Sequence, residues 1–129
     1  SLDNDDKDGA YGLYKTIVAG KHGAMSAEAK YRMAYIRHLQ GRYKDAEKEV
    51  FAMANDFSGH QHWISMGFIL LGDVYVQLND RFQAKAALQG VIDNSEEPEL
   101  VADAQARLNI LLNEEQQPAP VEGGEGDGN

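Results

Sequence analysis

The stretch "LQGRYKDAEKEV", residues Leu39–Val50, begins with a glycine turn and continues as a helix with one apolar face. Followed to its end, that face consists of Ala46, Val50, Met53 and Ala54, at positions i, i+4, i+7 and i+8. This spacing places all four side chains on one side of an α-helix. The fold depends on whether the pattern occurs once or recurs along the chain.

The pattern recurs twice more. It appears 38 residues later and 36 residues earlier, as Ala84, Leu88, Val91 and Ile92 and as Ala10, Tyr14, Ile17 and Val18. The helix before the turn also recurs, because "AEAKYRMAYI" from Ala27 resembles "ADAQARLNIL" from Ala102, with "SMGFILLGDV" from Ser65 between them. Self-similarity at a period of 20–50 residues indicates stacked structural repeats.

Turn signals separate these segments, so the sequence predicts an all-α fold of antiparallel helix hairpins. About six helices are expected, near residues 9–19, 26–40, 43–57, 60–78, 81–93 and 97–113. Full hairpin units are expected near 26–57 and 60–93, flanked by half-units at 9–19 and 97–113. The domain therefore covers 9–113, between an acidic leader at 1–8 and an acidic tail containing Gly and Pro at 114–129.

The net charge of −9 belongs mainly to the two ends of the chain. Residues 10–113 hold eleven basic and twelve acidic side chains, so no basic surplus favours nucleic acid as a partner. That span is itself uneven, because 10–56 has a basic excess and 57–113 an acidic one. There is no cysteine, and no apolar run approaches the roughly 20 residues that direct membrane insertion requires.

The second unit reads Phe68-x2-Leu71-Gly72-x2-Tyr75 and then Ala84-x3-Leu88. This resembles the tetratricopeptide repeat pattern W-x2-L-G-x2-Y followed by A-x3-F. The first unit departs from the pattern, with Lys30 and Arg37 at positions where aromatic residues are usual. The resemblance covers roughly residues 10–113 and implies a short right-handed α-solenoid, in which a small residue such as Gly72 lets the two helices of a hairpin approach closely.

In tetratricopeptide arrays the concave face is lined by the first helices of the hairpins and binds a partner peptide or helix. The resemblance therefore implies a non-enzymatic protein-interaction scaffold without a cofactor. Mapped from the small residue of each unit, the implied partner-binding residues are Tyr31, Tyr35, His38, Ile69, Asp73 and Val76, with Arg32 and Gln77 beside them. Tyr31 and Tyr35 have an equally weighted alternative, which is to fill space between helices.

The sequence is also similar to the C-terminal region of long tetratricopeptide proteins of Bacteroides-type bacteria. That similarity implies a periplasmic or outer-membrane-associated protein of the cell envelope. The helix at 9–19 matches the second helix of a hairpin without its first, so we expect the natural chain to continue upstream. The helix at 97–113 matches a first helix and is expected to cap the array.

Two other functions compete with the interaction scaffold. The oppositely charged halves favour head-to-tail self-association through the ends of the array. His60 and His62 in "HQHW" suggest a metal site, although two imidazoles at i, i+2 do not share a helical face and a linker is the simpler interpretation. A calcium loop at Asn4–Lys15 fails because Lys15 stands where a bidentate glutamate is required. No nucleophile constellation indicates an enzyme.

Overall fold

The six helices follow one another with short turns, in a computed structural model that describes residues 4–20 and 23–117. They are α1 (Asn4–Ala19), α2 (Ala24–Leu39), α3 (Tyr43–Asp56), α4 (Gln61–Gln77), α5 (Arg81–Asn94) and α6 (Pro98–Gln116). The described residues contain helices, turns and connecting segments but no strand. The predicted all-α class is confirmed, and four inner helices match the predicted ranges to within two residues.

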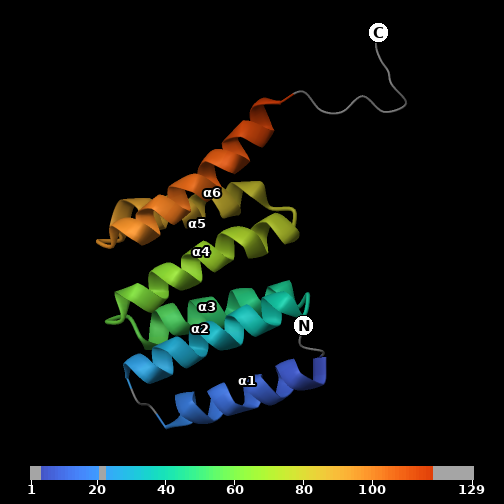
Figure 1. Ribbon diagram of the computed structural model, residues 1–129, viewed down its shortest axis with the longest axis vertical. Coiled ribbons are helices and arrows are strands. Elements are labelled where there is room, and N and C mark those ends of the chain that lie inside the picture. The colour runs from blue at the N-terminus through green and yellow to red at the C-terminus, as the bar shows by residue number, and fades with distance from the viewer. Residues whose placement is uncertain (1–3, 21–22, 118–129) are drawn as a thin grey trace.

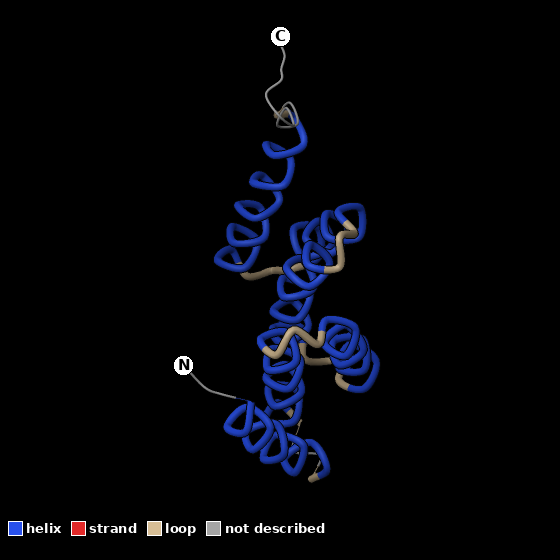
Figure 2. The backbone as a smooth tube through the Cα atoms, turned by 90° about the vertical axis from the view of Figure 1, so that its right-hand side faces the viewer, coloured by secondary structure: helices blue, strands red, loops and turns tan. Residues whose placement is uncertain are grey.

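Each helix packs against its neighbour in sequence, which gives adjacent antiparallel pairs (Figure 1). The helices α2, α4 and α6 lie side by side along one wall, and α3 and α5 lie along the other, which is on the right in Figure 2. Along the first wall, α4 contacts both α2 and α6. On the other wall the backbones of α3 and α5 nowhere approach within 8 Å in the described part of the chain. The stack therefore bends toward the α2–α4–α6 wall and opens on the opposite side.

Small residues allow the close packing within each hairpin. Ala34, Ala46 and Ala84 are completely buried. At Gly72 the nearest side chain across the hairpin belongs to Leu88, because a Cβ at Gly72 would lie 2.9 Å from Leu88 Cδ2. The side chain of this core leucine thus fills the space that a Cβ at Gly72 would take, in keeping with the dense packing of protein interiors.

The two outer helices are longer than predicted. Helix α1 begins at Asn4 because Asp5 and Asp6 lie in its first turn, where carboxylates favour the positive end of the helix dipole. Helix α6 continues to Gln116, and its last turns are held by ion pairs from Arg81 and Lys85 to Glu114 and Glu115. Residues 4–8 and 114–116 are therefore helical. The rest of the predicted leader and tail, 1–3 and 118–129, lies outside the described residues.

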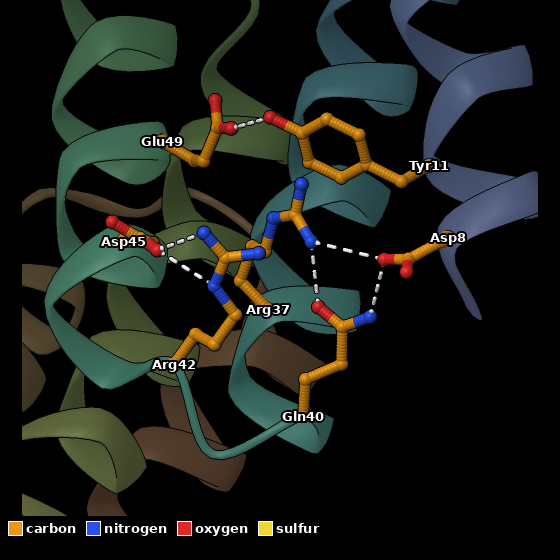
Figure 3. A network of polar contacts seen from close by, with 7 residues as sticks. All are labelled: Asp8, Tyr11, Arg37, Gln40, Arg42, Asp45 and Glu49. Atoms are coloured by element: carbon orange, nitrogen blue, oxygen red, sulfur yellow. Dashed lines mark hydrogen bonds and ion pairs between the residues drawn. The ribbon is translucent and has the colours of Figure 1, made fainter. Parts of the chain in front are cut away.

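Arg37, one of the two departures from the repeat pattern, is explained by the α1–α2 contact (Figure 3). Its guanidinium lies 3.6 Å from the centre of the Tyr11 ring, and it donates a hydrogen bond to Gln40. In the next unit the equivalent residue, Tyr75, donates a 2.6 Å hydrogen bond to Glu47, and this bond lowers the pKa of Glu47. Glu47 and Tyr11 occupy equivalent positions in their helices, because the 36 residues between them equal the repeat offset between α1 and α3.

The other departure, Lys30, forms an ion pair with Glu49 of α3 at 2.6 Å. Tyr11 of α1 donates a hydrogen bond to the same carboxylate (Figure 3). Tyr11 and Arg37 in the α1–α2 contact thus occupy the repeat positions that Glu47 and Tyr75 occupy in the α3–α4 contact. Phe68 stands at the position of Lys30 in the second unit, and there it makes an aromatic contact with Phe51 of α3 instead of a polar pair.

Candidate functional site

Five rings form a continuous row along the α2–α4–α6 wall, which we call the aromatic row. Three of them, Tyr31, Tyr35 and His38, come from one face of α2 at positions i, i+4 and i+7. Trp63 in the first turn of α4 and Tyr43 at the start of α3 extend the row at its two ends. Neighbouring ring centroids are 5.4 to 6.5 Å apart, within the range in which aromatic rings attract one another.

The rings of the row differ in how much surface they expose. Tyr31 is only 9% exposed, and burial raises the pKa of its phenol. Tyr35, in the middle of the row, is 41% exposed. The remaining three rings are half-buried. Tyr35 is thus the most exposed ring of the row, and the Tyr31 and His38 rings pack on either side of it.

His38 carries a polar atom that the described part of the chain does not satisfy. Its Nδ1 is buried and has no hydrogen-bond partner among the described residues. Burial lowers the pKa of His38, although the negative charge of Asp73 opposes this effect. The imidazole is therefore neutral at pH 7. A buried polar group without a partner costs free energy, so this nitrogen is a destabilising feature beneath the surface of α2.

Charged groups of both signs border the row. The Arg32 guanidinium lies 5.7 Å from the Tyr31 ring and 5.9 Å from the Trp63 ring. From the neighbouring helices, Asp73 of α4 accepts a 2.7 Å hydrogen bond from Arg107 of α6. These ionic groups join the three helices of the wall and place both charge signs beside the rings.

The structure brings most of the predicted partner-binding residues to this wall, in different environments. Ile69 is 6% exposed and belongs to the core, so it offers little surface to a partner. Val76 is half-buried against the same core, and Gln77 is exposed. Arg32, Tyr35, His38 and Asp73 retain accessible surface beside the rings.

Three residues of the site were missing from the prediction: Trp63, Tyr43 and Arg107. Trp63 stood out in the sequence beside the two histidines of "HQHW", and its ring lies against Tyr31. Arg107 is the repeat counterpart of Arg32, 75 residues earlier. Tyr43 had no comparable signal, because it begins a different helix and reaches the row only through its contact with His38.

The histidines proposed as metal ligands have other neighbours. The Nδ1 atom of His62 lies 2.8 Å from one carboxylate oxygen of Glu97, and the His60 ring lies beside Phe57. Within residues 4–20 and 23–117, no group of three His, Cys, Asp or Glu side chains is arranged to hold a metal ion. Of the other two histidines in the sequence, His38 belongs to the aromatic row and His22 lies outside the described residues.

The described chain is an all-helical domain of six helices, packed in sequence order as adjacent antiparallel pairs, consistent with a short helical repeat array. None of its described helices is both long and apolar enough to cross a membrane. Comparison with protein-family models, curated proteins and solved structures finds no match to this chain. Function must therefore be argued from the geometry of the site.

Proposed function

We propose that this chain is a non-enzymatic interaction module of the tetratricopeptide type, which binds a partner peptide or helix on the α2–α4–α6 wall. The observation that carries the proposal is the aromatic row, with the exposed Tyr35 ring at its centre. Tyrosine anchors bury a large area at low entropic cost and keep a polar end. By the resemblance already described, we place the protein in the bacterial cell envelope.

The curvature of the stack also supports binding of a partner on the α2–α4–α6 wall. Because α4 contacts both α2 and α6 while α3 and α5 diverge, the wall that carries the row is the inner one. Such a wall presents side chains from three helices to one ligand, and its rings are supported by packing from neighbouring helices. Preorganisation of this kind reduces the entropic cost of binding.

We expect Tyr35→Ala to weaken binding of a peptide selected on this domain from a displayed random library by about 10-fold or more. Isothermal titration calorimetry measures the Kd, and thermal unfolding followed by circular dichroism measures folding. The melting temperature should change by only a few degrees, because the ring is largely outside the core. Phe82→Ala on α5 is the matched control, since Phe82 is 78% exposed on the other wall. Equal affinity in the two variants would contradict the proposal.

A second candidate function is head-to-tail assembly, which exposed apolar residues at the two ends favour. Helix α1 has no fully buried residue, and its Leu13 is 71% exposed. At the other end, Ile110 of α6 is 57% exposed. Residues 10–56 have a basic excess and 57–113 an acidic one, which favours attraction between the opposite halves of two copies.

For this assembly we expect oligomers in sedimentation velocity at about 20 mM salt and their dissociation at about 500 mM, because salt screens exposed charges. Leu13→Glu should also shift the protein to monomer at low salt. Lys7→Glu changes the charge of the same helix but leaves Leu13 in place. Comparison of the two variants therefore separates the effect of the apolar contact from the effect of charge. A monomer at every salt concentration would exclude assembly and leave the interaction module as the function.

A further inference from the structure

A cavity of about 660 Å³ opens on the wall opposite the aromatic row. Its sides are formed by α4, by the end of α5 and by the segment that leads into α6. Phe68 of α4 lines it and also contacts Phe51 of α3 edge-on, at 6.1 Å between ring centroids. The cavity therefore lies where α3 and α5 diverge, and no residue of the aromatic row lines it.

The cavity combines an apolar floor with an acidic rim. Ile64, Phe68 and Val91 supply the floor, and Glu96 and Glu97 lie at the rim. Both carboxylate oxygens of Glu97 are within 3.0 Å of His62 Nδ1. Glu96 is exposed and has no hydrogen bond or ion pair within the described part of the chain. It is therefore available to pair with a cation.

Other local charges agree with this polarity. The segment "DNSEEPE", residues 93–99, contains four acidic residues and no basic one. The last turn of α5 lines the cavity, carries no basic residue and presents the negative end of a helix dipole. The amino ends of α4 and α6 act in the opposite direction. Each helix end, however, amounts to about half an elementary charge, whereas Glu96 contributes a full one.

We propose that this cavity binds an arginine or lysine side chain from a basic segment of a partner protein. The aliphatic stem would lie over Ile64 and Phe68, and the cationic group would pair with Glu96. Long basic side chains bury their stems on apolar surface while the charge stays at the rim, which is the arrangement of polarity seen here. Arginine fits best, because its planar guanidinium can donate two parallel hydrogen bonds to a carboxylate such as that of Glu96.

This site is independent of the interaction surface on the α2–α4–α6 wall. The two share no lining residue, because Trp63 and the cavity residues Ile64 and Phe68 lie on different faces of α4. The cavity volume is within the range of ligand sites, about 300–1,000 Å³, and is large enough for one side chain with its flanking backbone. A negative result for arginine binding in the cavity would leave the proposed binding on the aromatic row untouched, and a negative result for the aromatic row would leave the cavity proposal untouched.

The test is NMR titration of the protein with three capped pentapeptides, Gly-Ser-Xaa-Ser-Gly, in which Xaa is arginine, norleucine or glutamate. We expect the arginine peptide to shift the amide signals of Ser65, Gly90 and Asn94, with a Kd on the order of 1 mM. The norleucine peptide has a comparable apolar stem without the charge and should bind at least about 5-fold more weakly. The glutamate peptide should cause no shifts in the cavity.

Two variants decide whether the shifts come from this cavity. Gly90→Leu should abolish them, because Gly90 lines the cavity and a Cβ at this position would have no heavy atom within 4 Å, so the leucine side chain has room to fill the space that the arginine stem would occupy. The variant should remain folded, since leucine favours a helix more than glycine does, and its melting temperature should rise by about 3 °C. Glu96→Gln should weaken the arginine peptide about 5-fold, whereas Glu99→Gln, a matched change outside the lining, should not.

Several results would overturn the proposal. Equal binding of the arginine and norleucine peptides would make the cavity an apolar site without charge selectivity. Arginine-dependent shifts that persist in Gly90→Leu would show diffuse attraction to the acidic segment. Self-association that disappears in Gly90→Leu, without arginine-peptide binding by the parent protein, would make a second copy of this chain the occupant.

Discussion

Leu88→Ala is expected to lower the free energy of unfolding by about 3–4 kcal/mol, the largest effect of any single change considered for this protein. Leu88 is 1% exposed and packs into the space left by the missing side chain of Gly72. Its truncation removes apolar burial and leaves a cavity between α4 and α5. Since domains of this size are stable by only about 5–15 kcal/mol, the melting temperature should fall by roughly 15 °C. Urea denaturation followed by circular dichroism measures the change.

Gly72→Ala tests whether the two residues share one space. In the parent protein the new methyl group would lie 2.9 Å from Leu88 Cδ2, so we expect a loss of about 1–2 kcal/mol despite the better helix propensity of alanine. In the Leu88→Ala background the same change should become stabilising, by about 1 kcal/mol. Leu13→Ala, at a 71% exposed position, is the control and should change stability by under about 0.5 kcal/mol. Additive effects of Gly72→Ala and Leu88→Ala would contradict this packing.

The hairpins could be predicted because each repeat buries the same face. Ala46 and Ala84 are both completely buried, as their shared position in the pattern required. The ends of α1 and α6 were predicted too short for a different reason. Asp8 is hydrogen-bonded to Gln40, and Glu114 pairs with Arg81, which lies 33 residues away in sequence. Hydrophobic periodicity within a helix contains no information about such distant polar partners.

The candidate site was predictable to the extent that one helix carries it. The spacing of Tyr31, Tyr35 and His38 places them together on α2 regardless of what packs nearby. Their exposure could not be predicted, because it depends on how closely Trp63 of the next hairpin approaches. The cavity beside Phe68 had no signal in the sequence, since its lining comes from α4, from the end of α5 and from the segment that leads into α6. The spacing of these elements is a property of the assembled stack rather than of any one repeat.

Lys30→Met is the second change for which we expect a large effect, a loss of about 2–3 kcal/mol of stability. The Lys30 and Glu49 side chains are only 16% and 13% exposed, and their charged atoms are 2.6 Å apart. Glu49 of α3 lies where α1, α2 and α3 meet, a region called the seam below. Without the ammonium group, its carboxylate would stay there with the Tyr11 hydroxyl as its remaining polar partner. Removing one member of a largely buried ion pair is costly because the other charge is left uncompensated.

The double variant Lys30→Met/Glu49→Met should recover most of that loss, because two apolar side chains can fill the seam without a charge to desolvate. Lys44→Met is the matched control, since Lys44 pairs with Glu47 at 3.0 Å but its side chain is 73% exposed. Exposed pairs contribute under about 1 kcal/mol, so this control should be nearly neutral. If Lys30→Met and Lys44→Met cost the same, the seam is hydrated, and the polar contact between α2 and α3 adds little to the stability of the stack. If the double variant recovers stability, an aromatic at position 30 with an apolar residue at 49 would be tolerated, as at Phe68 in the following repeat.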